Sequence, residues 1–73
     1  HLTRAPDDAG ALALRGTTRA RRGDRDGAQR DFDRAISLDG REARAHAGRG
    51  NLRATAGDLQ GALEDLDRAV DLE

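Results

Sequence analysis

The chain is 73 residues long, with a formal net charge of −1, no cysteine and a single aromatic residue, Phe32. This length allows one small domain at most, and the lack of cysteine excludes a disulfide framework, so alanine and leucine must form the core. The balanced charge excludes a global field that would draw the chain onto nucleic acid or an anionic membrane, and no apolar stretch approaches the ~20 residues of a spanning helix. We therefore expect a cytoplasmic protein without a membrane contact.

Four helices are predicted along the chain, over residues 8–21, 25–38, 42–55 and 59–72. Pro6, followed by two aspartates, indicates the first helix start, because proline fits a first turn and acids favour the positive end of the helix dipole. Gly23 and Gly57 can adopt the left-handed conformation that ends a helix. The aspartate after each glycine can cap the next helix through its carboxylate.

The second and fourth predicted helices each have one apolar face and one charged face. The apolar residues recur at i, i+4, i+7 and i+8 in both helices, as Ala28, Phe32, Ala35 and Ile36, and as Ala62, Leu66, Ala69 and Val70. On the opposite face, Asp26 with Arg30 and Glu64 with Arg68 are spaced for pairing between neighbouring turns. These charges are expected to lie in solvent.

The sequence repeats itself at an offset of 34 residues. Segments 9–39 and 43–73 are identical at 16 of 31 aligned positions. The chain therefore consists of two tandem repeats, over residues 9–40 and 43–73. Residues 1–8 are expected to be an N-terminal tail or the end of a preceding repeat, in a piece of a longer protein.

The repeat resembles the tetratricopeptide repeat (TPR) family in its period and in its signature positions. These positions are a glycine in the first helix, an alanine early in the second, a bulky residue four positions later and a further alanine: Gly16, Ala28, Phe32 and Ala35, then Gly50, Ala62, Leu66 and Ala69. The resemblance implies an all-α fold, in which two antiparallel helix-turn-helix repeats stack as a short α-solenoid.

The resemblance also implies a protein–protein interaction module with a concave groove along the first helix of each repeat. The groove residues expected to contact a peptide or protein segment are Ala13, Leu14, Thr17, Arg21, Arg44, Asn51 and Thr55. This lining is shallow and holds two arginines and no acid, so a carboxylate-bearing partner with compact apolar side chains would fit it. The family's subclass that binds chaperone C-termini is not matched, because Ala13, Thr17 and Gly48 occupy its lysine and asparagine positions.

No residue is expected to be catalytic, and neither a metal nor a cofactor is expected. His46 has no companion at metal-ligand spacing and is expected to pack or to lie on the surface, while Asp31 and Asp33 are expected on solvated faces of a helix. The glycines do not follow phosphate-loop spacing. Arginines cluster between residues 15 and 25, but no aromatic residue is near them to stack on bases, so nucleic-acid binding is disfavoured.

The last predicted helix supports a second hypothesis, in which the chain assembles into a homo-oligomer. A further repeat would normally cover part of its apolar surface, formed by Leu59, Leu63, Leu66 and Val70. Residues 15–34 hold seven arginines against four aspartates, whereas residues 58–73 hold six carboxylates against Arg68. Two contacts are open: the last helix on the basic repeat of another copy, giving a stack or ring, or two last helices in a closed dimer.

Overall fold

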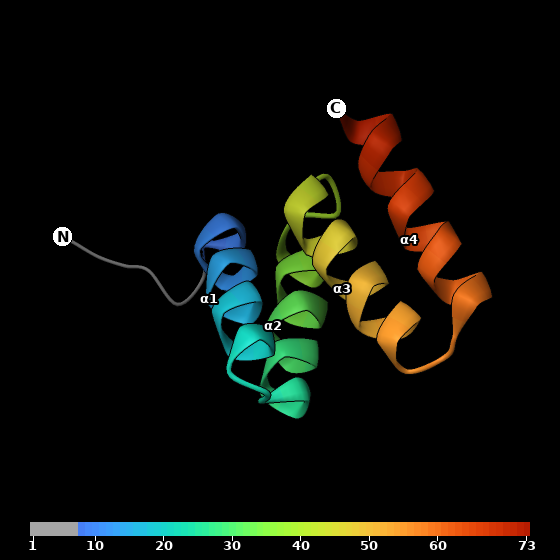
Figure 1. Ribbon diagram of the computed structural model, residues 1–73. Coiled ribbons are helices and arrows are strands. Elements are labelled where there is room, and N and C mark those ends of the chain that lie inside the picture. Colours follow the sequence, from blue (N-terminus) through green and yellow to red (C-terminus); the bar gives the residue numbers. More distant parts are fainter. Residues whose placement is uncertain (1–7) are drawn as a thin grey trace, which may run out of the picture.

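Four α-helices form the part of the chain that the computed structural model describes, residues 8–73. They are α1 (Ala9–Arg21), α2 (Arg25–Leu38), α3 (Ala43–Thr55) and α4 (Leu59–Leu72). Two antiparallel hairpins, α1–α2 and α3–α4, stack through contacts of α3 with both α1 and α2 (Figure 1). No strand occurs in these residues, and the predicted all-α fold of two stacked helix-turn-helix repeats is confirmed. The predicted N-terminal tail lies outside the described residues, apart from Asp8.

The helix ends follow from local chemistry that is the same in both repeats. Gly23 and Gly57 have φ values of 87° and 91°, in the left-handed region that glycine adopts without steric cost. The amide of Asp24 donates to the carbonyl of Arg19 at 2.9 Å, which satisfies a carbonyl at the end of α1. The carboxylates of Asp24 and Asp58 then accept from the amides of Gly27 and Gly61, each at 2.9 Å, and cap α2 and α4.

Asp8 caps α1 in the same way, because its Oδ1 accepts from the amides of Gly10 at 2.9 Å and Ala11 at 3.3 Å. The start of α3 is different. Its N-cap residue, Glu42, forms no side-chain hydrogen bond with the helix. The predicted left-handed helix ends and the aspartate caps of α2 and α4 are thus confirmed.

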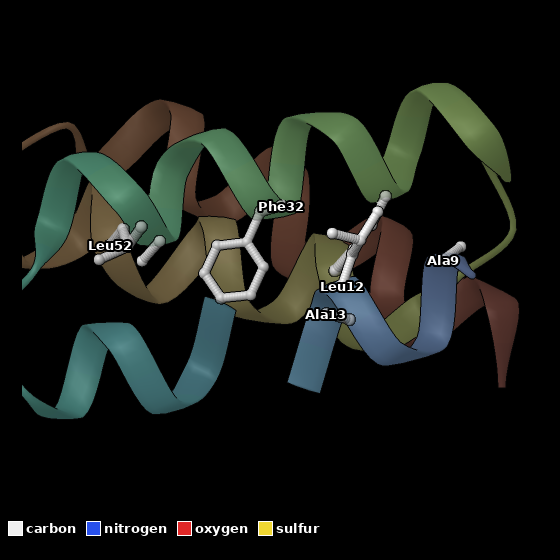
Figure 2. Packing of buried hydrophobic residues seen from close by; sticks show 8 residues of the cluster. Ala9, Leu12, Ala13, Phe32 and Leu52 are labelled. Carbon is white, nitrogen blue, oxygen red and sulfur yellow. The ribbon is translucent and has the colours of Figure 1, made fainter. Parts of the chain in front are cut away.

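The core is built around Phe32, which is 1% exposed and is the largest fully buried side chain. Its ring extends from α2 between Leu12 and Ala13 on one side and Leu52 on the other (Figure 2). Glycines at two helix crossings let the neighbouring backbones reach the ring. A Cβ at Gly16 would lie 2.8 Å from Phe32 Cε1, and one at Gly48 would overlap the same ring. The first repeat and the start of the second therefore share one core.

Each hairpin is also closed by a buried aspartate on its second helix. Asp31 is 4% exposed and accepts from Arg15 Nε at 3.0 Å, Arg15 Nη2 at 2.9 Å and Arg19 Nη1 at 3.2 Å. Asp65 in α4 is also 4% exposed and accepts from Arg49 Nε and Nη2 at 3.0 Å each and from Arg53 Nη1 at 3.0 Å. The two clusters occupy equivalent positions of the repeat.

The expectation that Asp31 lies on a solvated face is therefore wrong. The forked guanidinium of Arg15 satisfies both carboxylate oxygens, which offsets the cost of burying the charge. The hydrogen bond from Arg15 lowers the pKa of Asp31, despite the opposing effect of burial. In contrast, Asp33 is exposed as expected, and the described residues show no ion pair between Asp26 and Arg30.

Candidate functional site

Two adjoining hollows run along the line where α1 and α3 lie side by side. One has a volume of about 430 Å³ and is lined by Thr17, Ala20, Arg21, Arg25, Phe32, Gly48, Asn51, Leu52 and Thr55. The other has a volume of about 320 Å³ and is lined by Ala13, Leu14, Thr17, Arg44, Ala47, Gly48 and Asn51. Because they share three residues, we treat them together as the α1–α3 groove.

The structure brings all seven of the predicted groove residues into this groove. Thr17 and Asn51 line both hollows. The remaining five divide between them, with Arg21 and Thr55 in the larger hollow and Ala13, Leu14 and Arg44 in the smaller. Whether a ligand binds them stays a prediction, but their convergence on one surface follows from the register of the two repeats.

The groove is shallow and mostly apolar because small residues form its floor. Because Gly48 has no side chain, only the backbone of α3 lines the groove at this position, and the Phe32 ring forms part of the lining. The threonine hydroxyls contribute little to specificity, since Thr17 donates to the carbonyl of Ala13 at 3.1 Å and Thr55 donates to that of Leu52 at 2.9 Å. Among the described residues, the Asn51 amide forms no such bond and faces the groove.

The positive charge of the groove is compensated at one end and not at the other. Arg44 Nε donates to Glu42 Oε2 at 2.9 Å, and this bond raises the pKa of Arg44. No acidic residue lines either hollow, but the carboxylate of Glu42, outside the lining, compensates the charge of Arg44. No such pair forms at the other end, where neither Arg21 nor Arg25 has an ion pair within the described part of the chain.

Arg25 is a groove residue that the sequence did not predict. It lies at the start of α2, so the rule that first helices line the groove omitted it. Its guanidinium donates to the carbonyl of Leu52 at 3.3 Å and to Thr55 Oγ1 at 3.2 Å, which holds it across the stacked repeats. Its repeat counterpart is Leu59, so the 34-residue pattern offered no signal.

The residues predicted to mediate self-association lie along α4. Leu59, Leu63 and Val70 are 65%, 62% and 71% exposed, whereas Leu66 is half-buried. Within the described chain α4 packs only on α3 (Figure 1). Most of this apolar surface is thus uncovered.

His46 lies at the start of α3 and is 7% exposed. Its Nε2 is 2.9 Å from the carbonyl oxygen of Gly40, which ties the turn between the repeats to α3. No group of three His, Cys, Asp or Glu residues in segment 8–73 is arranged to hold a metal ion. The described helices are also too short and too polar for any of them to traverse a bilayer.

No family model matches this chain, and no curated protein is detectably similar to it. Three properties characterise the α1–α3 groove: a floor of small residues, an Asn51 amide without a side-chain hydrogen bond to the described residues, and a pair of arginines at one end.

Proposed function

We propose that the chain is a protein-interaction module, whose α1–α3 groove binds an extended, carboxylate-bearing segment of a partner protein. The observation that carries this proposal is the pair of arginines at one end of a groove with small apolar walls. Guanidinium groups bind carboxylates through charge-assisted, often forked hydrogen bonds. The Asn51 amide, midway along the groove, offers both a donor and an acceptor for a peptide backbone.

The proposed direction of binding follows from the charge distribution. Glu42 compensates Arg44 at the far end, so an acidic group is best placed near Arg21 and Arg25. Compact apolar side chains would then lie over Gly48 and Ala13 in the smaller hollow. The helical hairpins, their period of 34 residues and the close approach at Gly16 support membership of the TPR family, which we propose on the same grounds.

A displayed library of short peptides with free C-termini tests this function. Selection on the wild-type chain should enrich acidic peptides, and Arg21→Glu should weaken their binding by roughly tenfold or more, because it removes a charged hydrogen bond. Arg22→Glu is the matched control, since it makes the same charge change one residue away on a side chain that does not line the groove. Peptides that bind Arg21→Glu as tightly as the wild type would refute the groove assignment.

Self-association is the second candidate function, favoured by the exposure of Leu59, Leu63 and Val70 on α4. Three large apolar side chains on one helix face are costly to leave in water, at about 25 cal/mol per Å² of apolar surface. Contact with a second copy would remove this surface from solvent. Sedimentation of the wild type beside Leu63→Asp tests it: the mass of the wild type alone should rise with concentration.

A further inference from the structure

The way in which one repeat stacks on the next is visible inside the molecule. The ring of Phe32 on α2 packs against Gly48 on α3. Beside it, Arg49 Nη1 donates to Asp33 Oδ1 at 3.1 Å, from α3 across to α2. A large side chain opposite a glycine and one ion pair thus define the register between the repeats.

At the α4 end, the corresponding positions are uncovered. Phe32 is 1% exposed, but its counterpart Leu66 is only half-buried. Likewise Ile36 is half-buried against the core, whereas its counterpart Val70 is 71% exposed. The face of α4 that carries Leu63, Leu66 and Val70 is therefore the one to which a further first helix would bind.

The other end of the row of helices is formed by α1 (Figure 1). Ala45 and Leu52 on α3 are 0% and 8% exposed, but their counterparts on α1, Ala11 and Thr18, are both exposed. Leu14 is the counterpart of Gly48 and is 62% exposed. These α1 positions fall at i, i+3 and i+7, so they form one face.

The two open faces match each other in apolar character. Between α2 and α3 the pair is Phe32 with Gly48, a large side chain against none. At the ends the corresponding pair is Leu66 with Leu14, two side chains of medium size. Leu66 is smaller than Phe32 and Leu14 is larger than Gly48, so the two ends present apolar side chains of equal size to each other.

The two faces also match in charge. Arg49 binds Asp65 of its own hairpin through Nε and Nη2 and uses Nη1 to reach Asp33 of the other repeat. Arg15 binds Asp31 through the same two atoms, and its Nη1 has no partner within the described residues. The counterpart of Asp33 is Asp67, an exposed residue of α4.

We propose that α1 of a second copy of this chain docks on α4 in the register in which α3 docks on α2. Leu14 of the second copy then packs on Leu66, and its Arg15 Nη1 pairs with Asp67. This inference rests on the self-association function and selects one of its two contacts. A closed dimer through two α4 helices is disfavoured, because it brings the five exposed carboxylates of residues 58–73 close to five others.

The contact has a consequence for the groove. A second copy would place its α1 beside α3 of the first, as α1 lies beside α3 within one chain. Asn51 and Thr55 of the first copy would then face Leu14 and Thr17 of the second across a new hollow. Because this arrangement is heterologous, each added copy leaves a free α4, and the groove extends along a stack.

Two variants that each block one end test the orientation. Leu14→Asp blocks the α1 face, and Leu63→Asp blocks the α4 face; both side chains are 62% exposed, so folding should be unaffected. Ser37→Asp is the control, on an exposed position outside both faces. Mass is measured by sedimentation equilibrium up to about 1 mM, where weak contacts are populated, and helicity by circular dichroism.

The expected result is that the wild type and Ser37→Asp grow beyond a dimer, that each blocked variant alone is a monomer, and that their equimolar mixture doubles in mass and grows no further. If Leu14→Asp still associates as the wild type does, the orientation is wrong although self-association holds. If the wild type stays a monomer throughout, self-association itself fails. Neither outcome bears on peptide capture, which the Arg21 and Arg22 variants test separately.

Discussion

Gly48→Ala probes the close approach between the two repeats. A Cβ at this position would lie 2.9 Å from Phe32 Cε2 and nearer still to two other carbons of the ring. On its α1 side the ring is confined by Gly16, where a Cβ would lie 2.8 Å from Cε1. The substitution must therefore separate α3 from α2 or distort the ring.

The magnitude follows from two opposing effects. Alanine is favoured over glycine inside a helix by about 1 kcal/mol. Overpacking a core that cannot relax costs about 1–3 kcal/mol, and the confined ring places Gly48→Ala at the upper end. We expect a net loss of about 2 kcal/mol in the free energy of unfolding. For a domain of this size, that loss lowers Tm by roughly 8–16 °C.

Thermal unfolding followed by circular dichroism measures this change, with Gly40→Ala as the control. A Cβ at Gly40 has only the carbonyl oxygen of Ile36 near it, at 3.8 Å, so its stability should change by less than about 0.5 kcal/mol. Adding Phe32→Leu should partly rescue Gly48→Ala, with a favourable coupling of about 0.5–3 kcal/mol. A Gly48→Ala variant as stable as the wild type, or more stable, would refute the proposed packing of the repeats.

Three further predictions concern the ion clusters and the caps. Asp65→Asn weakens the cluster with Arg49 and Arg53 and should lower the free energy of unfolding in urea by about 1–3 kcal/mol. The exposed Asp71→Asn should leave it unchanged, and equal effects of the two variants would contradict the role of this cluster. The hydrogen bond from Arg15 lowers the pKa of Asp31 below its ordinary 3.8. The stabilisation from this pair is therefore complete above that value and is lost as the pH falls through the lower, folded-state pKa. Between pH 5 and 2 the free energy of unfolding should depend less steeply on pH in Asp31→Asn than in the wild type, and an equal dependence would contradict this prediction. Asp58→Ala should cost about 1 kcal/mol through loss of the α4 cap, and chemical denaturation that shows no loss would oppose this assignment.

The helix ends could be predicted from the sequence because their causes are local. Gly23 and Gly57 end helices through their own backbone freedom, and Asp24 and Asp58 cap the next helix within three residues. The facing of Thr17 and Asn51 could also be predicted, because the resemblance to the TPR family implied the groove and the 34-residue register transferred its positions from one repeat to the next. Only the helix ends required no knowledge of how distant segments meet.

The buried ion clusters were not predicted because they depend on the approach of two helices. Helical periodicity assigns every aspartate on a charged face to solvent, so Asp31 was expected there. A signal existed nevertheless: Arg15, Arg19 and Asp31 all recur unchanged 34 residues later, as Arg49, Arg53 and Asp65. Residues that two otherwise divergent repeats keep in common are candidates for contacts within each repeat.

The groove charge was also only partly predictable. Alignment placed Arg44 in the groove, but its side chain binds Glu42, two residues earlier, in a local contact that no repeat pattern specifies. Arg25 enters the groove from α2 because it reaches the carbonyl of Leu52 in the neighbouring repeat. The two described repeats meet at a single junction, so the sequence contains no second junction with which to compare these contacts.

Peptide capture in the α1–α3 groove is tested most directly by mapping a selected acidic peptide on the isotope-labelled chain by amide NMR, at concentrations where the chain is monomeric. The largest shift changes should fall on Thr17, Arg21, Asn51 and Thr55, and they should disappear in Arg21→Glu but persist in Arg22→Glu. Shift changes centred instead on Leu63 and Val70 of α4, with the groove residues unmoved, would contradict the proposed function.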